Sequence, residues 1–434
     1  MSLLAKVEYL VCHLHIKPED ILVISFTKKT VSELKERCAI AGVEIRTFHS
    51  LGHKLLCEAG IEGRLIKNSE FDDVIRTALA GIKEKHAEIF PNFDDLSRLV
   101  GSFLMLHKND GRTISELQFD ESPRTRAFLE MYNIVSTHYA GYLVKRQLYD
   151  FADMINLATK AVKTQPELAN NYRYILLDEV QDLSKNRQLL IRAILDKNPD
   201  CRLFAVGDDW QSIYRFAGSD LELIRNFAKV FNRKTRVSYI ESTHRFGRPT
   251  TKISSNFIQQ NKLQVCKKVR AARKIRTPIS IVYSEKADDD SVAVERIINE
   301  IGVEKLATKQ LQIISRFNHD VERLKSPNFR VRPIGNEVYE VIWRDVLRFE
   351  FCSMHKSKGI TRDIVIVLNM SSRPAGMPAS RPNDPLIEAL LAPEEDFAFA
   401  EERRLFYVAI TRAREHTFLI TDAKHPSPFV LEIM

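Results

Sequence analysis

The sequence predicts a multi-domain α/β protein built on parallel β-sheets. Its 434 residues are too many for one ordinary hydrophobic core and suggest roughly two to four domains. Short apolar runs rich in β-branched residues recur along the chain, and helical patterns separate most of them, which is typical of parallel α/β layers. The runs occupy residues 21–26, 174–178, 202–206, 311–315, 364–368 and 417–420.

Composition indicates a globular chain without a membrane partner. Hydrophobic residues make up 44% and charged residues 28% of the sequence, and no stretch reaches the roughly 18 uncharged apolar residues of a membrane span. Residues 1–20 are apolar in a helical rhythm but contain Glu8 and no small-residue cleavage site. They therefore predict a core helix and not a signal peptide.

The cysteine content and the net charge indicate the cellular compartment and the class of binding partner. The six cysteines are scattered, with no C-x-x-C pair and no dense framework, which favours a reducing cytoplasm. The net charge of +8 favours polyanionic partners, because a basic surface attracts them and releases their counterions. Nucleic acid is the first candidate partner.

The first apolar run leads into a predicted helix. The strand ILVISF at residues 21–26 is followed by KKTVSELKERC. In this second stretch Val31, Leu34 and Cys38 fall on one helical face. Residues 25–29 should therefore form a strand-to-helix turn at the carboxyl edge of the sheet, where ligands bind in α/β proteins.

Two segments depart from the α/β pattern. Residues 60 to about 150 are polar and helix-forming, with breaks at Pro91 and at 122–124, and predict a helical insertion. Residues 266–278 carry six Lys or Arg within ten residues and end in Pro278. This basic run predicts either a solvated linker or helix face, or a patch that contacts phosphates.

A cluster of acids closes the second apolar run, in YILLDEVQDL at residues 174–183. Asp178 and Glu179 follow the strand directly, so one carboxylate can reach Mg²⁺ and the next can orient an attacking water. The alternative is that the two acids only cap the next helix. The added Gln181 and Asp182 make the cluster more unusual than a lone acidic pair.

The third run opens the stretch LFAVGDDWQSIYRFAGSD at residues 203–220. A glutamine after a strand, a glycine turn and two acids can sense a terminal phosphate. The aromatics Trp210, Tyr214 and Phe216 can stack on unpaired bases, an interaction worth roughly 1–3 kcal/mol per base. The alternative is that they are core aromatics, but the polar and glycine neighbours argue against one fully buried stripe.

These two blocks resemble motifs II and III of the UvrD/Rep-like superfamily 1A DNA helicases. Further blocks follow the order of that family and span nearly the whole chain. ISFTKKTVSEL (24–34), RTFHSLGHKLL (46–56), ESTHRF (241–246), CSMHKSKG (352–359) and EERRLFYVAITRAR (401–414) resemble motifs Ia, Ib, IV, V and VI.

The resemblance implies two RecA-like parallel-sheet domains with ATP between them and a helical insertion in the first. Domain 1A would comprise residues 1–58 and 150–236, and insertion 1B residues 59–149. Domain 2A would comprise residues 237–434. It should be compact, because too few residues separate motifs IV and V for a large 2B subdomain.

By resemblance, five residues serve ATP and Mg²⁺, the implied cofactors. Asp178 would bind Mg²⁺ and Glu179 would be the catalytic base. Gln211 would sense the γ-phosphate. Arg245 and Arg412 would face the developing phosphoryl charge, a role that suits a planar and permanently charged guanidinium.

The resemblance also implies contacts with single-stranded and partly duplex DNA. Strand-contacting positions match Phe26, Thr47, His49 and His355, and base-stacking positions match Tyr214 and Phe216, with Trp210 as a further DNA-contacting aromatic. For Thr47 and His355 the alternative is an ordinary hydrogen bond within a loop.

Several positions depart from the family pattern. His244 stands where a tyrosine that stacks on adenine is common, and its ring is smaller and its charge depends on pH. Gly359 is the motif V glycine and is assigned to the nucleotide, but Thr361 replaces a glutamate that would contact the ribose. Lys356 and Lys358 are interpreted as solvated or close to phosphate.

The largest departure concerns the phosphate loop. Such a loop needs G-x-x-x-x-G-K-[ST], so that backbone N–H groups and a lysine surround the phosphates, and in this sequence no glycine precedes a lysine. Residues 2–11 resemble the helix that directly follows that loop. We therefore expect the first sheet to be incomplete at its N-terminal side.

Two functions remain open at this point. The first is an ATP-dependent 3′-to-5′ DNA helicase or translocase of the bacterial cytoplasm. The second is a non-hydrolysing DNA-binding protein, because the phosphate loop is missing. A plain structural protein would leave the acids and arginines unexplained.

Overall fold

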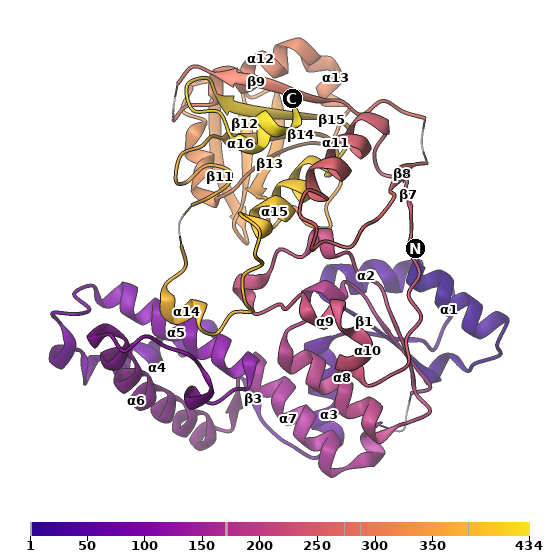
Figure 1. Cartoon of the computed structure of the whole chain (residues 1–434), viewed down its shortest axis with the longest axis vertical. Coiled ribbons are helices and arrows are strands. Elements are labelled where there is room, and N and C mark those ends of the chain that lie inside the picture. The colour runs from indigo at the N-terminus through magenta and orange to yellow at the C-terminus, as the bar shows by residue number, and fades with distance from the viewer. Residues whose placement is uncertain (1, 170–171, 273, 287, 381) are drawn as a thin grey trace. The chain divides into compact units, whose positions relative to one another are not determined.

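The computed structural model describes residues 2–169, 172–272, 274–286, 288–380 and 382–434. They form two compact units, coloured by residue number in Figure 1. Unit 1 is Met1–Asp208, Tyr214–Thr235 and Asn383–Pro393, and unit 2 is Asp209–Ile213, Arg236–Pro382 and Glu394–Met434. Each unit holds its own sheet with parallel strands, which confirms the predicted α/β fold class.

The sheet of unit 1 has four parallel strands in the order β2-β1-β5-β6. Their bounds are Ile21–Ser25 for β1, Glu44–Thr47 for β2, Tyr174–Leu177 for β5 and Arg202–Ala205 for β6. β1, β5 and β6 confirm the first three predicted runs. Every residue of β1 and β5 is buried, so these two strands are apolar on both faces.

Helices cover both faces of this sheet. They are α1 Ser2–Cys12, α2 Lys28–Arg37, α3 Phe48–Glu58, α7 Phe151–Thr164, α8 Lys185–Lys197, α9 Glu222–Arg225 and α10 Phe227–Phe231. α1 buries Leu3, Val7 and Leu10, which are spaced along one helical face, and so confirms the predicted core helix. α2 buries Val31 and Leu34 as predicted.

Residues between α3 and α7 are helical, as their composition predicts. The helices are α4 Asn68–Ala80, α5 Phe93–Asp110 and α6 Pro123–Arg146, and the short strands β3 Arg64–Leu65 and β4 Leu148–Tyr149 join them to the rest of the unit. Pro123 starts α6 because a proline at the first helical position loses no hydrogen bond, and Ser122 caps the helix. The helix α14, Pro385–Glu388, packs against α5 in Figure 1 and adds Leu386 to this core.

The sheet of unit 2 has the order β11-β12-β13-β10-β14-β15-β9. The strands are β9 Ile279–Ser284, β10 Leu311–Ser315, β11 Phe329–Gly335, β12 Val338–Trp343, β13 Leu347–Ser353, β14 Arg362–Met370 and β15 Ala413–Asp422. β10, β14 and β15 confirm the last three predicted runs. β11, β12 and β13 pair in antiparallel fashion and were not predicted, because charged residues interrupt their apolar ones.

The remaining elements complete the two units. Unit 2 contains α11 Arg248–Ile258, α12 Ser291–Ile301, α13 Val303–Ala307, α15 Ala400–Ile410 and α16 Pro428–Ile433, with the short parallel pair β7 Ser242–Thr243 and β8 Arg270–Ala271. Short 3₁₀ helices are η1 Pro18–Asp20, η2 Lys83–His86, η3 Ile114–Glu116, η4 Pro166–Ala169, η5 Val180–Asp182, η6 Asp209–Gln211, η7 Arg215–Ala217 and η8 Asn318–Arg323. Across the described residues we find no helix with the length and apolarity needed to cross a membrane.

The basic run at 266–278 divides between two environments. Lys267 lies inside unit 2, where its Nζ is 2.5 Å from Asp209 Oδ1 and 4.9 Å from the ring centre of Trp210. The lysines and arginines that remain exposed are Lys268, Arg270, Lys274 and Arg276, and Arg273 lies outside the described residues. Lys267 is therefore neither solvated nor a phosphate contact, and both interpretations stay open for the exposed members.

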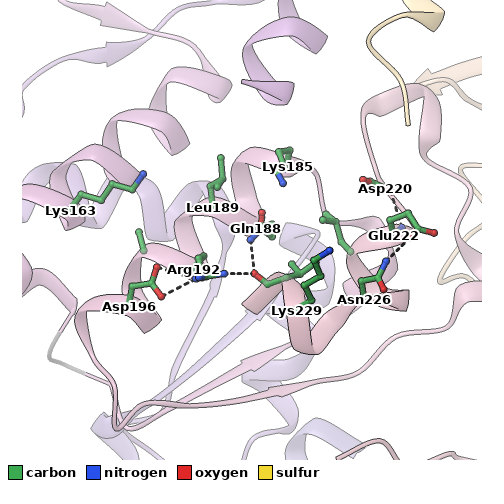
Figure 2. A pocket seen from close by; sticks show the side chains of 13 residues that line it. Lys163, Lys185, Gln188, Leu189, Arg192, Asp196, Asp220, Glu222, Asn226 and Lys229 are labelled. Carbon is green, nitrogen blue, oxygen red and sulfur yellow. Dashed lines mark hydrogen bonds and ion pairs between the residues drawn. The ribbon is translucent and has the colours of Figure 1, made fainter. Parts of the chain in front are cut away.

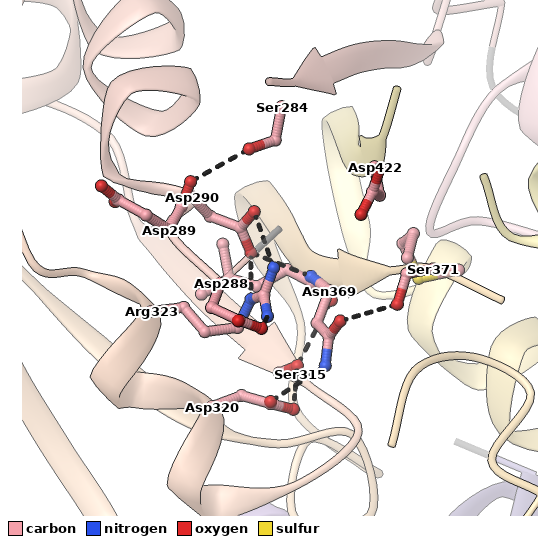
Figure 3. Close-up of polar contacts among 12 residues, drawn as sticks. Ser284, Asp288, Asp289, Asp290, Ser315, Asp320, Arg323, Asn369, Ser371 and Asp422 are labelled. Carbon is pink, nitrogen blue, oxygen red and sulfur yellow. Dashed lines mark hydrogen bonds and ion pairs between the residues drawn. The ribbon is translucent and has the colours of Figure 1, made fainter. Parts of the chain in front are cut away.

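A buried polar network joins the carboxyl ends of β10 and β14 in unit 2 (Figure 3). Arg323 donates to both carboxylate oxygens of Asp290, through Nε at 2.6 Å and Nη2 at 3.2 Å. The backbone N–H of Asn369 donates to the same Asp290, and its side-chain amide donates to Asp320 at 3.0 Å. Because these groups are buried, each hydrogen bond offsets a desolvation cost.

Candidate nucleotide and DNA site

Asp178 lies at the carboxyl end of β5 in unit 1. Its backbone N–H donates to Ile24 O at 2.9 Å, which continues the pairing of β5 with β1. The hydroxyl of Ser25, the last residue of β1, then donates to Asp178 Oδ2 at 3.0 Å. Ser25 is fully buried, so this hydrogen bond holds the carboxylate at the sheet edge where ligands bind in parallel α/β folds.

Glu179 turns the chain sharply away from β5. Its φ of 49° lies in the left-handed region, which a non-glycine residue adopts only in a well-determined turn. The side chain of Gln181 donates to Glu179 Oε2 and accepts from Asp208 N at 2.9 Å. The buried Gln181 therefore joins the turn after β5 to the turn after β6.

Gly207 is required by this close approach of two turns. A Cβ atom at Gly207 would lie 2.5 Å from Val180 Cγ1 and 2.8 Å from Gln181 Oε1, both closer than side-chain carbons approach in proteins. The glycine in the GDD stretch therefore serves the packing that places Gln181 beside Glu179.

The Asp178 carboxyl is a weaker acid than an ordinary aspartate. Burial, followed by the negative charge of Glu179, raises its pKa to about 6, although the hydrogen bond from Ser25 acts in the opposite direction. Two neighbouring carboxyl groups suit a divalent cation that takes oxygen ligands.

The carboxylates of Asp178 and Glu179 suit Mg²⁺ better than a metal ion that is bound only by protein side chains. Within the described residues, no group of three or more His, Cys, Asp or Glu side chains is arranged to hold a metal. Mg²⁺ commonly uses one or two protein carboxylates and takes its other ligands from water and substrate phosphates. Asp178 can supply such a ligand.

We predict that Asp178→Asn stabilises unit 1 near neutral pH. The folded-state pKa of about 6 exceeds the ordinary 3.8, so the folded protein binds this proton more tightly than the unfolded chain. This stabilisation is present at low pH and is lost as pH rises from about 4 to about 6, and the ionised carboxyl then costs at most about 3 kcal/mol. Urea unfolding at about pH 4 and about pH 8 measures the effect, and a gain equal at both values would contradict it.

A second group of predicted residues meets in unit 2. Arg412 Nη2 donates to the side-chain oxygen of Gln211 at 3.4 Å, and Lys358 Nζ donates to the backbone carbonyl of Gln211 at 2.8 Å. Arg412 is 1% exposed, and its Nε donates at 2.8 Å to the carbonyl of Val408, which lies in α15. The glutamine of motif III, a lysine of motif V and an arginine of motif VI therefore come together.

Motif IV contributes Arg245 to the same unit. Its Nη1 donates to the carbonyl of Thr411, the neighbour of Arg412, at 3.5 Å. Gly247 lets this loop approach the backbone of residue 275, because a Cβ there would lie 1.7 Å from Ile275 O. His244 is exposed beside it, and Gly359 is exposed with a φ of 78° that favours glycine.

The side chain of Trp210 is buried, so the prediction that it contacts DNA was wrong. The sequence predicts a DNA contact, but the indole is 1% exposed and packs against Ile258 and Tyr407, with ring centres of Trp210 and Tyr407 5.5 Å apart. Its Nε1 donates to Val265 O at 3.0 Å. The polar neighbour that suggested exposure, Asp209, is itself buried and accepts from Val265 N at 2.7 Å.

Tyr214 and Phe216 of unit 1 are more exposed than Trp210. Phe216 is 49% exposed and Tyr214 is half-buried, with ring centres 6.0 Å apart. Burial, followed by the charges of Asp182 and Glu179, raises the pKa of Tyr214 to about 12, so its hydroxyl stays protonated. The aromatic pair therefore begins beside the acidic turn that carries Glu179.

Motifs Ia and Ib place Phe26 and His49 near one half-buried arginine, Arg187. Arg187 lies over the Phe26 ring at 4.5 Å. Burial, followed by the charges of Arg187 and Lys28, lowers the pKa of His49 to about 4, so its ring is neutral at pH 7. Thr47 caps α3 by accepting from Ser50 N at 3.2 Å, which is the ordinary hydrogen bond left open as its alternative role.

His355 in unit 2 is also neutral at pH 7. Burial, followed by the charges of Arg316 and Lys358, lowers its pKa to about 3. A neutral imidazole can donate or accept a hydrogen bond but does not attract phosphate by charge. A DNA contact of His355 would therefore be a hydrogen bond or a stacking contact.

Two protein-family models match this chain. The model for the UvrD/REP helicase N-terminal domain matches residues 2–232, and the model for the UvrD-like helicase C-terminal domain matches residues 344–424. The first match alone covers more than half of the chain. The chain belongs to the UvrD/Rep helicase family.

Two curated relatives are each 26% identical to this chain over the aligned residues. DNA helicase IV of Escherichia coli strain K12 is 26% identical over 99% of this chain and 65% of its own length. The putative ATP-dependent DNA helicase YjcD of Bacillus subtilis is 26% identical over 69% of this chain and 40% of its own length. This chain therefore spans about two thirds or less of these two relatives.

Two residues without a predicted role contribute to the sites of this UvrD/Rep family member. Ser25 bonds Asp178, and Arg187 lies over Phe26. A sequence signal exists for Ser25, since it ends the strand that pairs in register with β5. Arg187 has no such signal, because only packing brings α8 beside the β1 turn.

A groove of about 570 Å³ lies elsewhere in unit 1, between α8 and the α9–α10 segment (Figure 2). Arg192 crosses it, bonding Asp196 at 2.9 Å and Val230 O at 2.7 Å, and Gln188 donates to the same carbonyl. None of the predicted site residues lines this groove. We assign the chemistry to the sheet edge and not to the groove.

Proposed function

We propose that this chain is the motor of an ATP-dependent DNA helicase that moves 3′-to-5′ along single-stranded DNA. The observation that carries the proposal is the Asp178–Glu179 pair at the carboxyl end of β5, held by Ser25 and Gln181. Acids at this position suit phosphoryl transfer, where positioning and charge supply most of the catalysis. Family membership supports DNA as the partner.

Each polar group then has a chemical task. ATP with Mg²⁺ supplies the phosphoryl group and the free energy that drives movement. Asp178 would hold the metal, and Glu179, fixed by Gln181, would orient a water and take its proton. Gln211 and the arginines Arg245 and Arg412 would respond to the terminal phosphate.

The expected cellular setting is a bacterial cytoplasm, and the expected substrate is DNA with a single-stranded tract beside a duplex. The E. coli and B. subtilis relatives support this setting. A duplex with a 3′ single-stranded tail should be unwound in preference to one with a 5′ tail. Preference for the 5′ tail would contradict the proposed polarity.

We predict that Phe216→Ala weakens binding of single-stranded DNA by roughly 5- to 100-fold, because one exposed stacking platform is lost. Fluorescence anisotropy with a labelled thymidine oligomer measures the affinity. Tyr283→Ala is the matched control, since Tyr283 is an exposed aromatic of similar exposure on β9, at the edge of the other sheet. Equal affinity of the Phe216 variant and the wild type would contradict the stacking role.

A second candidate function is DNA binding without ATP hydrolysis. It is favoured by one observation, the lack of any Gly-Lys pair and hence of a G-x-x-x-x-G-K-[ST] loop in these residues. This second candidate predicts little or no ATPase activity stimulated by single-stranded DNA for the 434-residue chain. Stimulated turnover in the usual enzyme range of about 1–1,000 per second would exclude this candidate.

A further inference from the structure

The segment Asn383–Pro393 belongs to unit 1 although it comes from the C-terminal part of the chain. It lies between motifs V and VI in the sequence. Leu386 and Leu390 are 1% and 5% exposed and enter the core formed by α4, α5 and α6. Burial of the two leucine side chains anchors this segment on the helical part of unit 1.

Two arginines anchor this segment through ion pairs at the two ends of α14. Arg124 of α6 holds Asp384 at the start of α14 through a paired contact, with Nη1 3.1 Å from Asp384 Oδ1. Arg215 holds Glu388 at the end of α14, also through both terminal nitrogens. Arg215 Nε additionally donates to Ala392 O at 2.6 Å.

The contact made by Arg215 differs from the one made by Arg124 in the residues that it positions. Arg215 stands between Tyr214 and Phe216, the two aromatics available for DNA. Its guanidinium uses three nitrogens on Asn383–Pro393, and its side chain is 11% exposed. A planar guanidinium that forms several hydrogen bonds has little rotational freedom, so the backbone that carries it is fixed as well.

Glu388 is itself held in place for this contact. Asn383 Nδ2 donates to Glu388 Oε2 at 2.9 Å. Burial alone would raise the pKa of Glu388, but the hydrogen bonds from Arg215 and Asn383 keep the pKa below its usual value. The carboxylate is therefore charged at pH 7 and keeps its bond to Arg215.

We propose that Asn383–Pro393 is a clamp that positions the Tyr214–Phe216 aromatics for stacking on DNA bases. Glu388 and Arg215 are positioning residues, because they act on the bases only through the two rings. The proposal rests on the stacking role given to Phe216 above. It makes a segment between motifs V and VI a determinant of DNA binding by motif III.

The first test compares the two ends of the same segment. Glu388→Gln should weaken binding of a thymidine oligomer about 3- to 10-fold by loosening Arg215. Asp384→Asn removes the other ion pair and should change the affinity less than about twofold. Arg215→Lys keeps the charge but loses the fork, so it should fall between Glu388→Gln and the wild type. Equal weakening by Asp384→Asn would overturn the proposal, since it would indicate general loosening.

Amide hydrogen exchange tests the clamp without DNA. The N–H groups of Ala217 and Gly218 bond Tyr214 O and Arg215 O at 2.9 and 2.8 Å, inside the clamped turn. Their exchange should accelerate about tenfold in Glu388→Gln and not in Asp384→Asn. Unchanged exchange in Glu388→Gln would overturn the clamp even if DNA binding were weaker.

A double variant separates this proposal from the proposed function. In the Phe216→Ala protein, Glu388→Gln should cause a smaller loss than it causes in the wild type, because only Tyr214 is left for the clamp to position. Fully additive losses would overturn the positioning role. A normal affinity of Phe216→Ala alone would instead overturn the stacking assignment, and the exchange data would still report whether the clamp exists.

Discussion

Glu179→Gln is expected to reduce DNA-stimulated ATP hydrolysis by about 100- to 10,000-fold in a version of the chain that carries a G-x-x-x-x-G-K-T loop before α1. The amide keeps the shape of Glu179 and can still bond Gln181, but it cannot take a proton from water. Binding of single-stranded DNA should stay within about twofold, because the role proposed for Glu179 is in ATP hydrolysis and not in base contact. A steady-state coupled ATPase assay measures the turnover.

The control for this variant is an acid of the same unit outside the site. Asp196 lies on α8, is paired with Arg192 and is half-exposed. Asp196→Asn should leave the turnover within about twofold of the parent. If Glu179→Gln retained most of the activity of the loop-bearing parent, the assignment of the catalytic base would be wrong.

Asp290→Ala is expected to lower the free energy of unfolding of unit 2 by about 3–5 kcal/mol. Asp290 is 1% exposed and takes two hydrogen bonds from Arg323, which is 8% exposed, so the variant removes the carboxylate that these two hydrogen bonds satisfy (Figure 3). The backbone N–H of Asn369 loses an acceptor as well. Urea unfolding followed by circular dichroism measures the change.

Asp288 provides a matched control on the same arginine. It lies 3.6 Å from Arg323 Nη1, but its side chain is 74% exposed. Asp288→Ala should cost less than about 1 kcal/mol, because water screens this pair. Replacing Asp290 and Arg323 together by apolar residues should restore much of the loss, and a cost for Asp290→Ala as small as for Asp288→Ala would contradict the buried role.

Five of the six strands that the sequence predicted correctly share one property, and the edge strand β6 is the exception. β1, β5, β10 and the centres of β14 and β15 are flanked by neighbours on both sides and buried on both faces, so they appear as continuous apolar runs. β11, β12 and β13 are antiparallel and partly exposed, and charged residues such as Arg330 and Arg332 interrupt their apolar pattern. A short window cannot separate such strands from loops.

The side-chain environments of the GDDWQSIYRF stretch show where local sequence fails. Trp210 and Phe216 lie six residues apart in similar polar surroundings, yet one is 1% and the other 49% exposed. The difference comes from residues distant in the chain, since Val265 and Tyr407 enclose Trp210. No pattern within the stretch contains those partners.

The sequence alone therefore determined the family and the fold class and predicted the candidate site residues, because ordered motifs and buried parallel strands leave local patterns. Only the tertiary structure decided which groups hold those residues. Ser25 reaches Asp178 across 153 residues, and Glu388 reaches Arg215 across 173 residues. Such contacts depend on how separate elements pack, and no short stretch of the sequence contains both partners.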